Sequence, residues 1–329
     1  MYIIALEVVV VVERLTSNLP ALKGRSVVSM MEWTPEEIIQ LLNTAQWMKG
    51  NRDTVQSRGV LAGKHVALLF ELPSTRTRVS FQVAISMLGA EPVWLDWGSS
   101  QLGRGESLED TARVLSRYVD AIVVRAHRHE TVQALRRYAT VPVFNALTDR
   151  AHPFQVLADA MTIREELGGW SGIKLSYLGD GNNMAHSYLV IGAKLGMDIT
   201  IATPEGYEPL SEIVQWARGE ATLTGGSVTI TGNPEQAVFG ADVVATDVFV
   251  SMGDSGDLDR KRELMEAFQI NRTRMQLAKP QAIFLHCLPA HRGEEVTADV
   301  IDGPQSKVFD QAENRLWVQM AGLAHTLGA

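Results

Sequence analysis

The sequence predicts an α/β protein built from two parallel-sheet domains. The chain has 329 residues, more than one small hydrophobic core requires. From Leu22 onward, short apolar segments rich in β-branched residues alternate with helical segments, which is the pattern of parallel strands covered by helices on both faces. Hydrophobic residues make up 46% and charged residues 21%, so the composition is that of an ordinary globular protein.

The first half contains four expected strands separated by helices. A capped helix should begin after Thr34 and end near Gly50, a second should span about 75–88, and a third should follow the capping residue Ser107. The expected strands are HVALLF (65–70), PVWLD (92–96), DAIVVR (120–125) and VPVFNA (141–146).

The second half repeats this rhythm without an internal repeat or flexible linker. Its expected strands are KLSYLG (174–179), MDITIA (197–202), SVTI (227–230), ADVVATD (241–247) and AIFLHC (282–287). We place the boundary between the halves near Arg150, which gives domains over 22–150 and 151–311 and a last helix over 312–329. Residues 1–21 form an N-terminal extension to which we assign no function.

Charge and cysteine content exclude several classes of protein. The net charge of −8 argues against nucleic acid as the main partner, since phosphate backbones are held by basic surfaces. The only cysteine is Cys287, so no intrachain disulfide can form, and a reducing, cytoplasmic compartment is expected. The apolar run at 2–12 is too short to span a bilayer and lacks the features of a secretory signal, so no membrane association is expected.

Unusual polar residues follow six of the expected strands. In parallel sheets, ligands bind beyond the carboxyl ends of the strands, so these residues predict a cleft lined from both halves. They are ELPSTRTR (71–78), Arg125, LTDRAHPFQ (147–155), DGNN (180–183), VFVSMG (248–253) and LPAHRGEE (288–295).

The most informative of these segments is Ser74-Thr75-Arg76-Thr77-Arg78. It joins a buried strand to a helix, where free backbone N–H groups and the helix dipole favour an anion. A single Ser or Thr here would be only a cap, but three hydroxyls with a guanidinium favour a site for a phosphate dianion.

This run and five further motifs resemble the aspartate/ornithine carbamoyltransferase family from Leu22 to the C-terminus. The further motifs are HPFQ (152–155), DGNN (180–183), D-x-x-x-SMG (247–253), HCLP (286–289) and AENR (312–315). The SMG and HCLP motifs are similar to those of the ornithine branch. The resemblance implies a carbamoyl-phosphate domain, an amino-acid domain and a last helix that packs back on the first domain. It also implies transfer of a carbamoyl group from carbamoyl phosphate to the δ-amine of ornithine, giving citrulline for arginine biosynthesis.

The resemblance also implies roles for individual residues. Arg125, His152, Asp247 and Cys287 would be catalytic, and Asn183, Asp247, Ser251 and Met252 would bind ornithine. The residues expected to bind carbamoyl phosphate are Ser74, Thr75, Arg76, Thr77, Gln101, Arg125, His152, Gln155, Cys287, Leu288 and Arg315. At the end of the strand 120–125, His127 is an alternative to Arg125 for this role. Asn183 on its own could be only a helix cap. We further expect the thiolate of Cys287 to help the δ-amine lose its proton.

No metal or organic cofactor is expected for this reaction, and the sequence leaves three other functions to consider. Putrescine-using relatives share much of the HCLP region, although an SMG loop favours an amino acid that carries an α-carboxylate. Gly179-Asp180-Gly181 resembles part of a dinucleotide fingerprint, but Met184 stands at the third glycine position, so an NAD-linked oxidoreductase is disfavoured. A carbamoyl-phosphate-binding subunit without activity is disfavoured because the catalytic motifs are filled.

The segment WGSSQLGRGES (97–107) predicts an exposed loop, because it is rich in glycine and serine. In the family the matching loop reaches into the neighbouring subunit. The resemblance therefore implies a homotrimer, or a multiple of trimers, in which Gln101 is donated to another subunit's site.

Overall fold

The computed structural model describes residues 22–251, 254 and 256–328 of the chain. These residues form two compact units. The first comprises residues 22–148 together with 315–328, and the second comprises the described residues of Asp149–Asn314. Residues 1–21 and Met252 lie outside the described part, so the predictions made for them are not tested.

The first unit contains a four-stranded parallel sheet in the order β2-β1-β3-β4. Its strands are β1 (His65–Phe70), β2 (Glu91–Asp96), β3 (Ala121–Arg125) and β4 (Val143–Leu147). Its helices are η2 (Met30–Glu32), α2 (Pro35–Gly50), α3 (Arg52–Arg58), α4 (Thr75–Met87), η3 (Leu102–Arg104), α5 (Leu108–Leu115) and α6 (His129–Tyr138), with the C-terminal part of α14 (Val308–Leu327).

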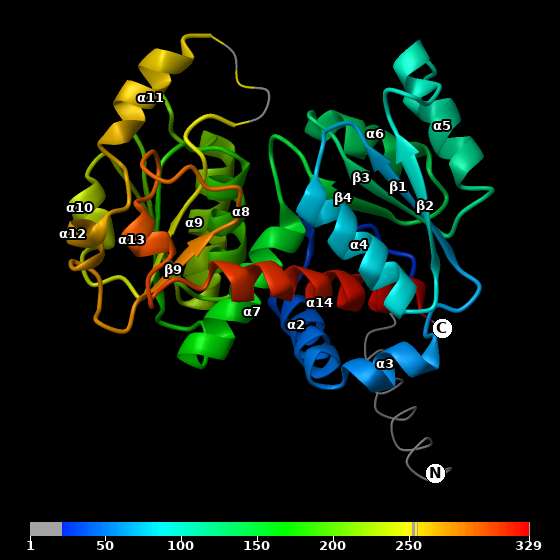
Figure 1. The fold of residues 1–329 in the computed structure, drawn as a ribbon, viewed down its shortest axis with the longest axis horizontal. Helices are drawn as coiled ribbons and strands as arrows, with labels where there is room; N and C mark the ends of the chain where they lie inside the picture. The colour runs from blue at the N-terminus through cyan, green and yellow to red at the C-terminus, as the bar shows by residue number, and fades with distance from the viewer. Residues whose placement is uncertain (1–21, 252–253, 255, 329) are drawn as a thin grey trace. The chain divides into compact units, whose positions relative to one another are not determined.

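Helices cover both faces of this sheet. Alternate side chains of β1 and β3, among them Leu69 and Val124, pack with Ala112 of α5 and Leu135 of α6 in one buried cluster. Figure 1 shows α4 and α6 on opposite faces of the sheet. Side chains alternate between the two faces of a strand, so the remaining apolar residues of β1 point to the face that α4 covers.

The second unit contains a five-stranded parallel sheet in the order β7-β6-β5-β8-β9. Its strands are β5 (Lys174–Leu178), β6 (Asp198–Ala202), β7 (Ser227–Thr231), β8 (Val243–Thr246) and β9 (Ile283–His286). Its helices are α7 (Pro153–Leu167), α8 (Asn183–Lys194), α9 (Ser211–Thr224), α10 (Pro234–Val238), α11 (Leu258–Glu266), α12 (Arg272–Met275) and α13 (Ala298–Ile301), and α14 begins in this unit.

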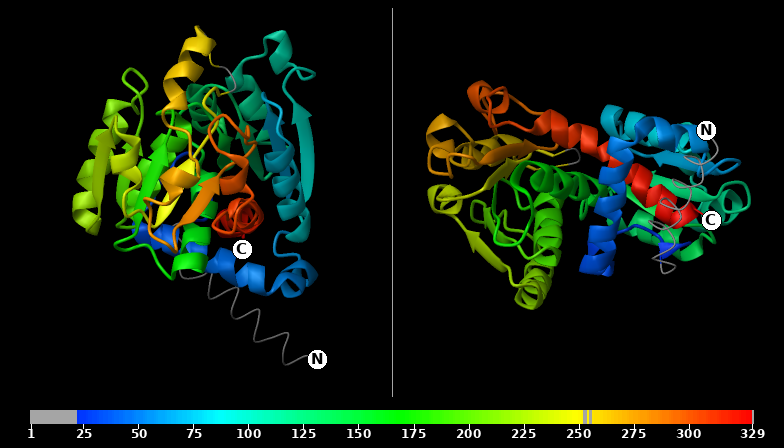
Figure 2. Two further views of the ribbon diagram at one scale, coloured as in Figure 1. Left: turned by 60° about the vertical axis from the view of Figure 1, so that its left-hand side comes forward. Right: turned by 90° about the horizontal axis from the view of Figure 1, so that it is seen from below.

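This sheet is also covered on both faces. Leu178, Val244 and Phe284 face a buried cluster to which α10, α12 and α13 contribute. The next residues along the strands point the other way, and Tyr177 of β5 meets Tyr188 of α8 with ring centroids 5.7 Å apart. The views in Figure 2 separate the helices of the two faces.

The fold confirms the predicted class of two parallel-sheet α/β domains with a C-terminal helix that returns to the first. The nine expected strands are present, and β1 has the predicted bounds. The capping box at Thr34 is also present: its hydroxyl accepts from the N–H of Glu37, whose carboxylate accepts from the N–H of Thr34. None of the described helices is long and apolar enough to cross a membrane.

One of the expected helix boundaries agrees with the structure and another differs. Helix α2 ends at Gly50, as expected, and Asn51 is its C-cap. Helix α14 begins at Val308 rather than near residue 312, so Arg315 lies about two turns inside the helix. The AENR motif is polar but has good helix formers, which is why the helix runs through it.

Each sheet has one place where the strand order reverses direction, and ligands of open α/β sheets bind there. In the first unit this place lies between β1 and β3, and in the second between β5 and β8. The segments that follow these four strands carry the STRTR motif, Arg125 itself, the DGNN motif and Asp247. The topology therefore places four of the predicted polar segments at the two preferred positions.

Candidate active site

In the first unit, the STRTR motif forms the start of α4. Ser74 is the N-cap, with extended backbone, and its hydroxyl accepts from the N–H of Thr77 at 3.2 Å. Only Thr77 of this turn is buried, while Thr75 is exposed. The turn thus presents backbone N–H groups and hydroxyls at the positive end of a 13-residue helix.

Two buried arginines converge on the hydroxyl of Thr77. Arg315 Nη2 donates to Thr77 Oγ1 at 2.7 Å, and Arg125 Nη1 donates to the same oxygen at 3.4 Å. Arg315 is 4% exposed and Arg125 is 6% exposed. A hydroxyl has two lone pairs and one proton, so Thr77 accepts from both arginines and keeps its O–H available as a donor. This arrangement gives the start of α4 two fixed positive charges and a directed hydroxyl.

The remaining basic residues of this region lie in different surroundings. Arg76 is half-buried on the first turn of α4, whereas the guanidinium of Arg78 lies 3.6 Å from the centroid of the Trp94 ring and so stacks on β2. His127 is exposed, and its backbone N–H donates to Glu71. Of the two candidates at the end of β3, the geometry favours Arg125.

Gln101 lies at an ordered and exposed loop, as the sequence predicted. Backbone bonds from the N–H groups of Arg104 and Glu106 to the carbonyl of Gln101 fold the loop, and Leu102 anchors it in the buried cluster of the first unit. Gly103 permits the tight turn, because a Cβ there would lie 2.7 Å from the carbonyl oxygen of Gly98. Within the described residues, the side chain of Gln101 is exposed and forms no hydrogen bond.

In the second unit, the HPFQ motif starts α7. His152 is the N-cap residue and is 3% exposed, and its backbone N–H donates to Ser187 Oγ at 2.9 Å. Gln155 is 1% exposed, and its amide nitrogen donates to Asp159 at 2.9 Å. Among the described residues, nothing donates to Gln155 Oε1, so this buried acceptor can take a ligand N–H.

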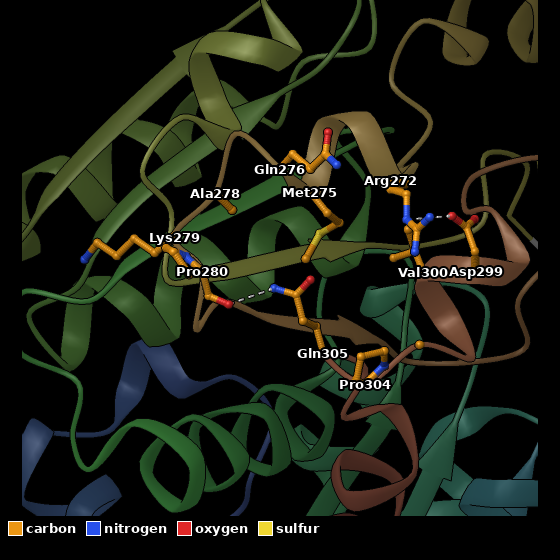
Figure 3. A pocket seen from close by; sticks show the side chains of 11 residues that line it. Arg272, Met275, Gln276, Ala278, Lys279, Pro280, Asp299, Val300, Pro304 and Gln305 are labelled. Carbon is orange, nitrogen blue, oxygen red and sulfur yellow. Dashed lines mark hydrogen bonds and ion pairs between the residues drawn. The ribbon is translucent and has the colours of Figure 1, made fainter.

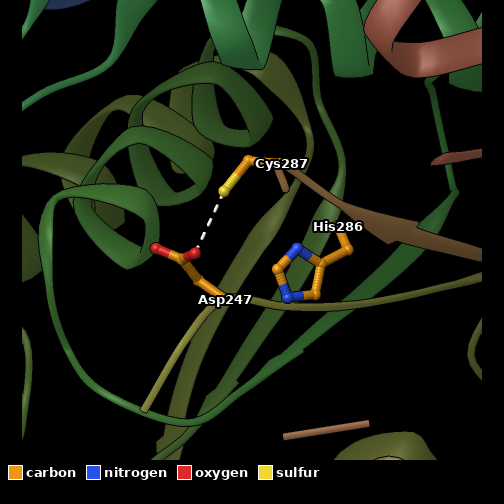
Figure 4. A group of neighbouring side chains, drawn as sticks. All are labelled: Asp247, His286 and Cys287. Atoms are coloured by element: carbon orange, nitrogen blue, oxygen red, sulfur yellow. Dashed lines mark hydrogen bonds between the residues drawn. The ribbon is translucent and has the colours of Figure 1, made fainter. Parts of the chain in front are cut away.

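Asp247 and Cys287 form a direct pair at the ends of β8 and β9. The thiol donates to Asp247 Oδ1 at 3.0 Å, as Figure 4 shows. The other carboxylate oxygen of Asp247 accepts from the amide of Asn182 at 3.2 Å. The distance of 3.0 Å fits a hydrogen bond from a protonated thiol to the carboxylate, and the thiolate role of Cys287 stays a prediction.

The amide of Asn182 is oriented by its surroundings. Its Oδ1 accepts from the N–H groups of Met184 and Ala185 and from the hydroxyl of Tyr177 at 3.3 Å. Burial, followed by the nearby Asp247 carboxylate, raises the pKa of Tyr177 well above its usual value, so the phenol keeps its proton. The Asn182 Nδ2 must then face Asp247 and Ser251 Oγ, which lies 3.3 Å away.

A second set of hydrogen bonds holds the HCLP segment in place. The ring of His286 is fully buried; its Nδ1 accepts from the N–H of Leu288 at 2.9 Å and its Nε2 lies 3.1 Å from Glu295 Oε1. Leu288 has φ +58°, a left-handed conformation that is uncommon and strained for a bulky side chain. The His286 ring thus stabilises an unusual backbone beside Cys287.

Among the residues that the structure describes, two groups of side chains could offer ligands to a metal ion. In each, the candidate ligand atoms lie within 4.8 Å of one another, and the groups are Asp247, His286 and Cys287, and His291, Glu294 and Glu295. In the first group both nitrogens of His286 already have partners in the backbone and Glu295, and the thiol is bound to Asp247. These bonds favour a hydrogen-bonded network over a metal site.

The structure adds Asn182 to the candidate site residues, because it contacts Asp247 and Ser251. The sequence motif points to Asn183 as an ornithine ligand or a helix cap, whereas the cap in the structure is Asn182. Asn183 is half-buried, and its carbonyl accepts from Ser187. The DGNN motif was the signal, but the sequence does not show which of two adjacent asparagines is the cap.

A cavity of about 390 Å³ lies elsewhere in the second unit. Figure 3 shows its rim, where Arg272 faces Asp299 and the amide of Gln305 donates to the carbonyl of Pro280. Pro280 precedes β9, so the cavity lies at the amino end of that strand, whereas Cys287 follows its carboxyl end. It is therefore distinct from the polar residues described above.

Known protein families match both units of the chain. A family model described as the carbamoyl-P binding domain of aspartate/ornithine carbamoyltransferase matches residues 25–165, and one for the Asp/Orn binding domain matches residues 171–326. A protein named ornithine carbamoyltransferase from Pyrococcus abyssi is 50% identical over 308 residues, covering 94% of this chain and 97% of the relative.

Pyrococcus furiosus provides a second relative and a solved structure. Its protein named anabolic ornithine carbamoyltransferase is 50% identical over 308 residues, covering 94% of this chain and 98% of the relative. The solved structure of the ornithine carbamoyltransferase from that organism has a TM-score of 0.90 at 50% identity, covering 93% of this chain and 98% of that one. On these matches, the chain belongs to the aspartate/ornithine carbamoyltransferase family.

Proposed function

We propose that this chain transfers the carbamoyl group of carbamoyl phosphate to the δ-amine of L-ornithine, giving L-citrulline and phosphate. The observation that carries the proposal is the hydrogen-bonded group of Asn182, Ser251, Asp247 and Cys287 at the reversal point of the second sheet. It offers a carboxylate and amide and hydroxyl groups, which suit the ammonium and carboxylate ends of an amino acid. Relatives about half identical in sequence carry the corresponding name.

In the first unit, the start of α4 would hold the phosphate. Ser74, Thr75, Arg76 and Thr77 supply hydroxyls, backbone N–H groups and a positive charge. Arg125 and Arg315 add charge at the Thr77 hydroxyl. As the C–O bond to phosphate breaks, negative charge grows on the leaving group, so these contacts strengthen in the transition state and accelerate the reaction.

In the second unit, the HPFQ and HCLP segments would hold the carbamoyl group. The ring of His152 would donate to its carbonyl oxygen, and the free acceptor of Gln155 would take a proton of its amide. The backbone carbonyls of Cys287 and Leu288 would accept from the same amide. The left-handed conformation of Leu288 supports this role, since such strain of about 1–3 kcal/mol is retained mainly where it serves a site.

Asp247 and Cys287 would prepare the nucleophile. An alkyl amine with a pKa of ~10.4 is mostly protonated at neutral pH, and its neutral form lies roughly 4–5 kcal/mol uphill. Asp247 would accept a hydrogen bond from the substrate amine, and the Cys287 thiol would hold that carboxylate in orientation. The neutral amine forms the C–N bond, phosphate leaves with the C–O electron pair, and the proton that the attacking nitrogen loses passes to the departing phosphate. Asn183, Ser251 and Met252 would complete the ornithine pocket.

We also propose a cytoplasmic homotrimer, or a multiple of trimers, that works toward citrulline in arginine biosynthesis. The word anabolic in the name of the P. furiosus relative supports the direction. The ordered loop that exposes Gln101 supports donation of this side chain to a neighbouring subunit. The lone cysteine suits a reducing compartment.

The test is product formation from carbamoyl phosphate with ornithine, putrescine, lysine and aspartate assayed side by side. We expect citrulline from ornithine, with a kcat/KM far above the values for the other three amines. Preferential carbamoylation of putrescine would replace this proposal, and absence of carbamoylation with all four would refute it.

A further inference from the structure

Lys261 is a buried cation on α11 that no catalytic motif includes. Its side chain is 8% exposed, and its Nζ lies 2.7 Å from Asp180 Oδ2 and 2.7 Å from Asp254 Oδ2. The ring of Tyr207 lies 5.3 Å from the same ammonium. A lysine is seldom buried unless its charge is matched, so this arrangement departs from the usual solvated lysine.

The neighbouring basic residues of α11 show the contrast. Arg260 and Arg262 have side chains 58% and 47% exposed and pair only with acidic residues of the same helix or with exposed Glu294. Such surface pairs contribute little to stability. Lys261 alone turns inward from this charged run, and it joins residues that lie 81 and 7 positions away in the chain.

Through Asp254, Lys261 is linked to Ser251. The carboxylate oxygen that receives the lysine also accepts from the N–H of Ser251 at 2.8 Å. The N–H of Asp254 donates back to the carbonyl of Ser251 at 3.1 Å. The position of Ser251 is therefore tied to a carboxylate whose charge Lys261 balances.

Through Asp180, Lys261 is linked to Asn182. Gly181, between them, fits against the backbone of residues 207–209, where a Cβ would approach within 2.3 Å of Pro209 N. Asn182 then donates to both Ser251 Oγ and Asp247 Oδ2. Lys261 and Asn182 thus bridge the same two segments, one following β5 and the other following β8.

We propose that Lys261 is a positioning residue for substrate selectivity, which fixes Ser251 so that its hydroxyl can recognise the α-amino acid end of ornithine. This inference rests on the proposed function. Lys261 itself is enclosed by Asp180, Asp254 and Tyr207, so it acts through Ser251 and not by touching the substrate.

The experiment compares Lys261→Met with Arg262→Met, a matched removal of a cation from the exposed part of the same helix. For Lys261→Met we expect the KM for ornithine to rise roughly 10- to 100-fold, as misplaced binding groups commonly cause, with little change in the KM for carbamoyl phosphate. The inhibition constant of norvaline, which has the α-amino acid end of ornithine but no δ-amine, should rise by the same factor. Arg262→Met should change none of these values.

A double-substitution cycle tests whether Lys261 acts through Ser251. In a Ser251→Ala background, Lys261→Met should add less than twofold to the norvaline inhibition constant. Full additivity, or an unchanged norvaline constant in Lys261→Met, would overturn the inference while leaving the proposed function intact if the parent still uses ornithine. If Lys261→Met does not fold, as judged by circular dichroism, Asp254→Asn weakens the same link, and an unchanged norvaline constant there would equally refute it.

Discussion

Arg315 Nη2 lies 2.7 Å from Thr77 Oγ1, although the residues are 238 positions apart in the chain. With Arg125 also donating to this oxygen, Thr77 has both lone pairs occupied and one proton directed away from them. The hydroxyl is thus set as a donor by two cations, at the point where the phosphate is expected to bind.

Thr77→Val should test this arrangement, because valine keeps the shape but loses the hydroxyl. We expect the KM for carbamoyl phosphate to rise about 10- to 100-fold, which corresponds to the 1.5–3 kcal/mol of a hydrogen bond to a charged group. Thr77→Ser retains the hydroxyl and is the control, with an effect of less than about threefold. Equal losses in the serine and valine variants would show that the methyl group matters and not the O–H.

The pair formed by Cys287 and Asp247 leads to a prediction about the amine. The kcat/KM for ornithine should rise from neutral to mildly alkaline pH, because the neutral δ-amine becomes more abundant. Cys287→Ala should lower this value substantially while carbamoyl-phosphate binding, measured by calorimetry, stays nearly unchanged. A profile that is flat with pH would contradict the need for a neutral amine.

Cys287→Ser separates two roles of the thiol. Serine can still donate to Asp247 but ionises far less readily than cysteine, so it should keep more activity than alanine if the thiol orients the carboxylate. A loss as large as that of Cys287→Ala would instead show that the thiolate is required.

Because two histidines are buried, we expect the folded protein to lose stability in mild acid. Burial lowers the pKa of His325 from 6.5 to about 4, and the same cause lowers that of His186 to about 4. The unfolded chain therefore binds more protons between these values, so stability is complete above pH 6.5 and falls as the pH drops toward 4. Within this window, each histidine should lower the free energy of unfolding by about 1.4 kcal/mol for each unit by which the pH falls.

His325→Gln checks the assignment. The Nε2 of His325 lies 2.8 Å from the hydroxyl of Thr44, which itself donates to the carbonyl of Gln40. Glutamine can still donate to Thr44 but does not titrate, so the fall in the free energy of unfolding between pH 7 and pH 5 should be smaller than in the parent. An identical fall in both proteins would show that His325 does not titrate in this range.

The sequence predicts the strands and the segments at their ends because both depend on local patterns. Buried parallel strands such as HVALLF are nearly continuous apolar runs, and β1 has the expected bounds for that reason. Arg125 ends β3, Asp247 follows β8 and Thr77 lies in the helix that follows β1, and parallel pairing places these segments at one edge of each sheet.

The links between these segments depend on tertiary contacts that a local pattern does not contain. Lys261 stands in the charged run of α11, whose composition is typical of an exposed helix, and only the fold brings it to Asp180. Arg76 and Arg78 alternate in one motif, yet Trp94 of β2 binds the second. Asn182 and Asn183 differ by one position, and the start of α8 decides which one caps the helix.

The last prediction is that catalysis needs two subunits, with Gln101 of one completing the site of the next. A small anion needs many donors, and the start of α4 offers few beyond its own turn. Mixing Gln101→Ala chains with Arg76→Ala chains should therefore restore activity, since in a randomly mixed trimer about one quarter of the sites receive both intact residues. Each variant taken alone through the same dissociation and reassembly is the control and should stay near its own low activity. Activity no higher than the average of the parents, or a monomer in light scattering, would show that each subunit supplies its own Gln101 or that Gln101 has no role.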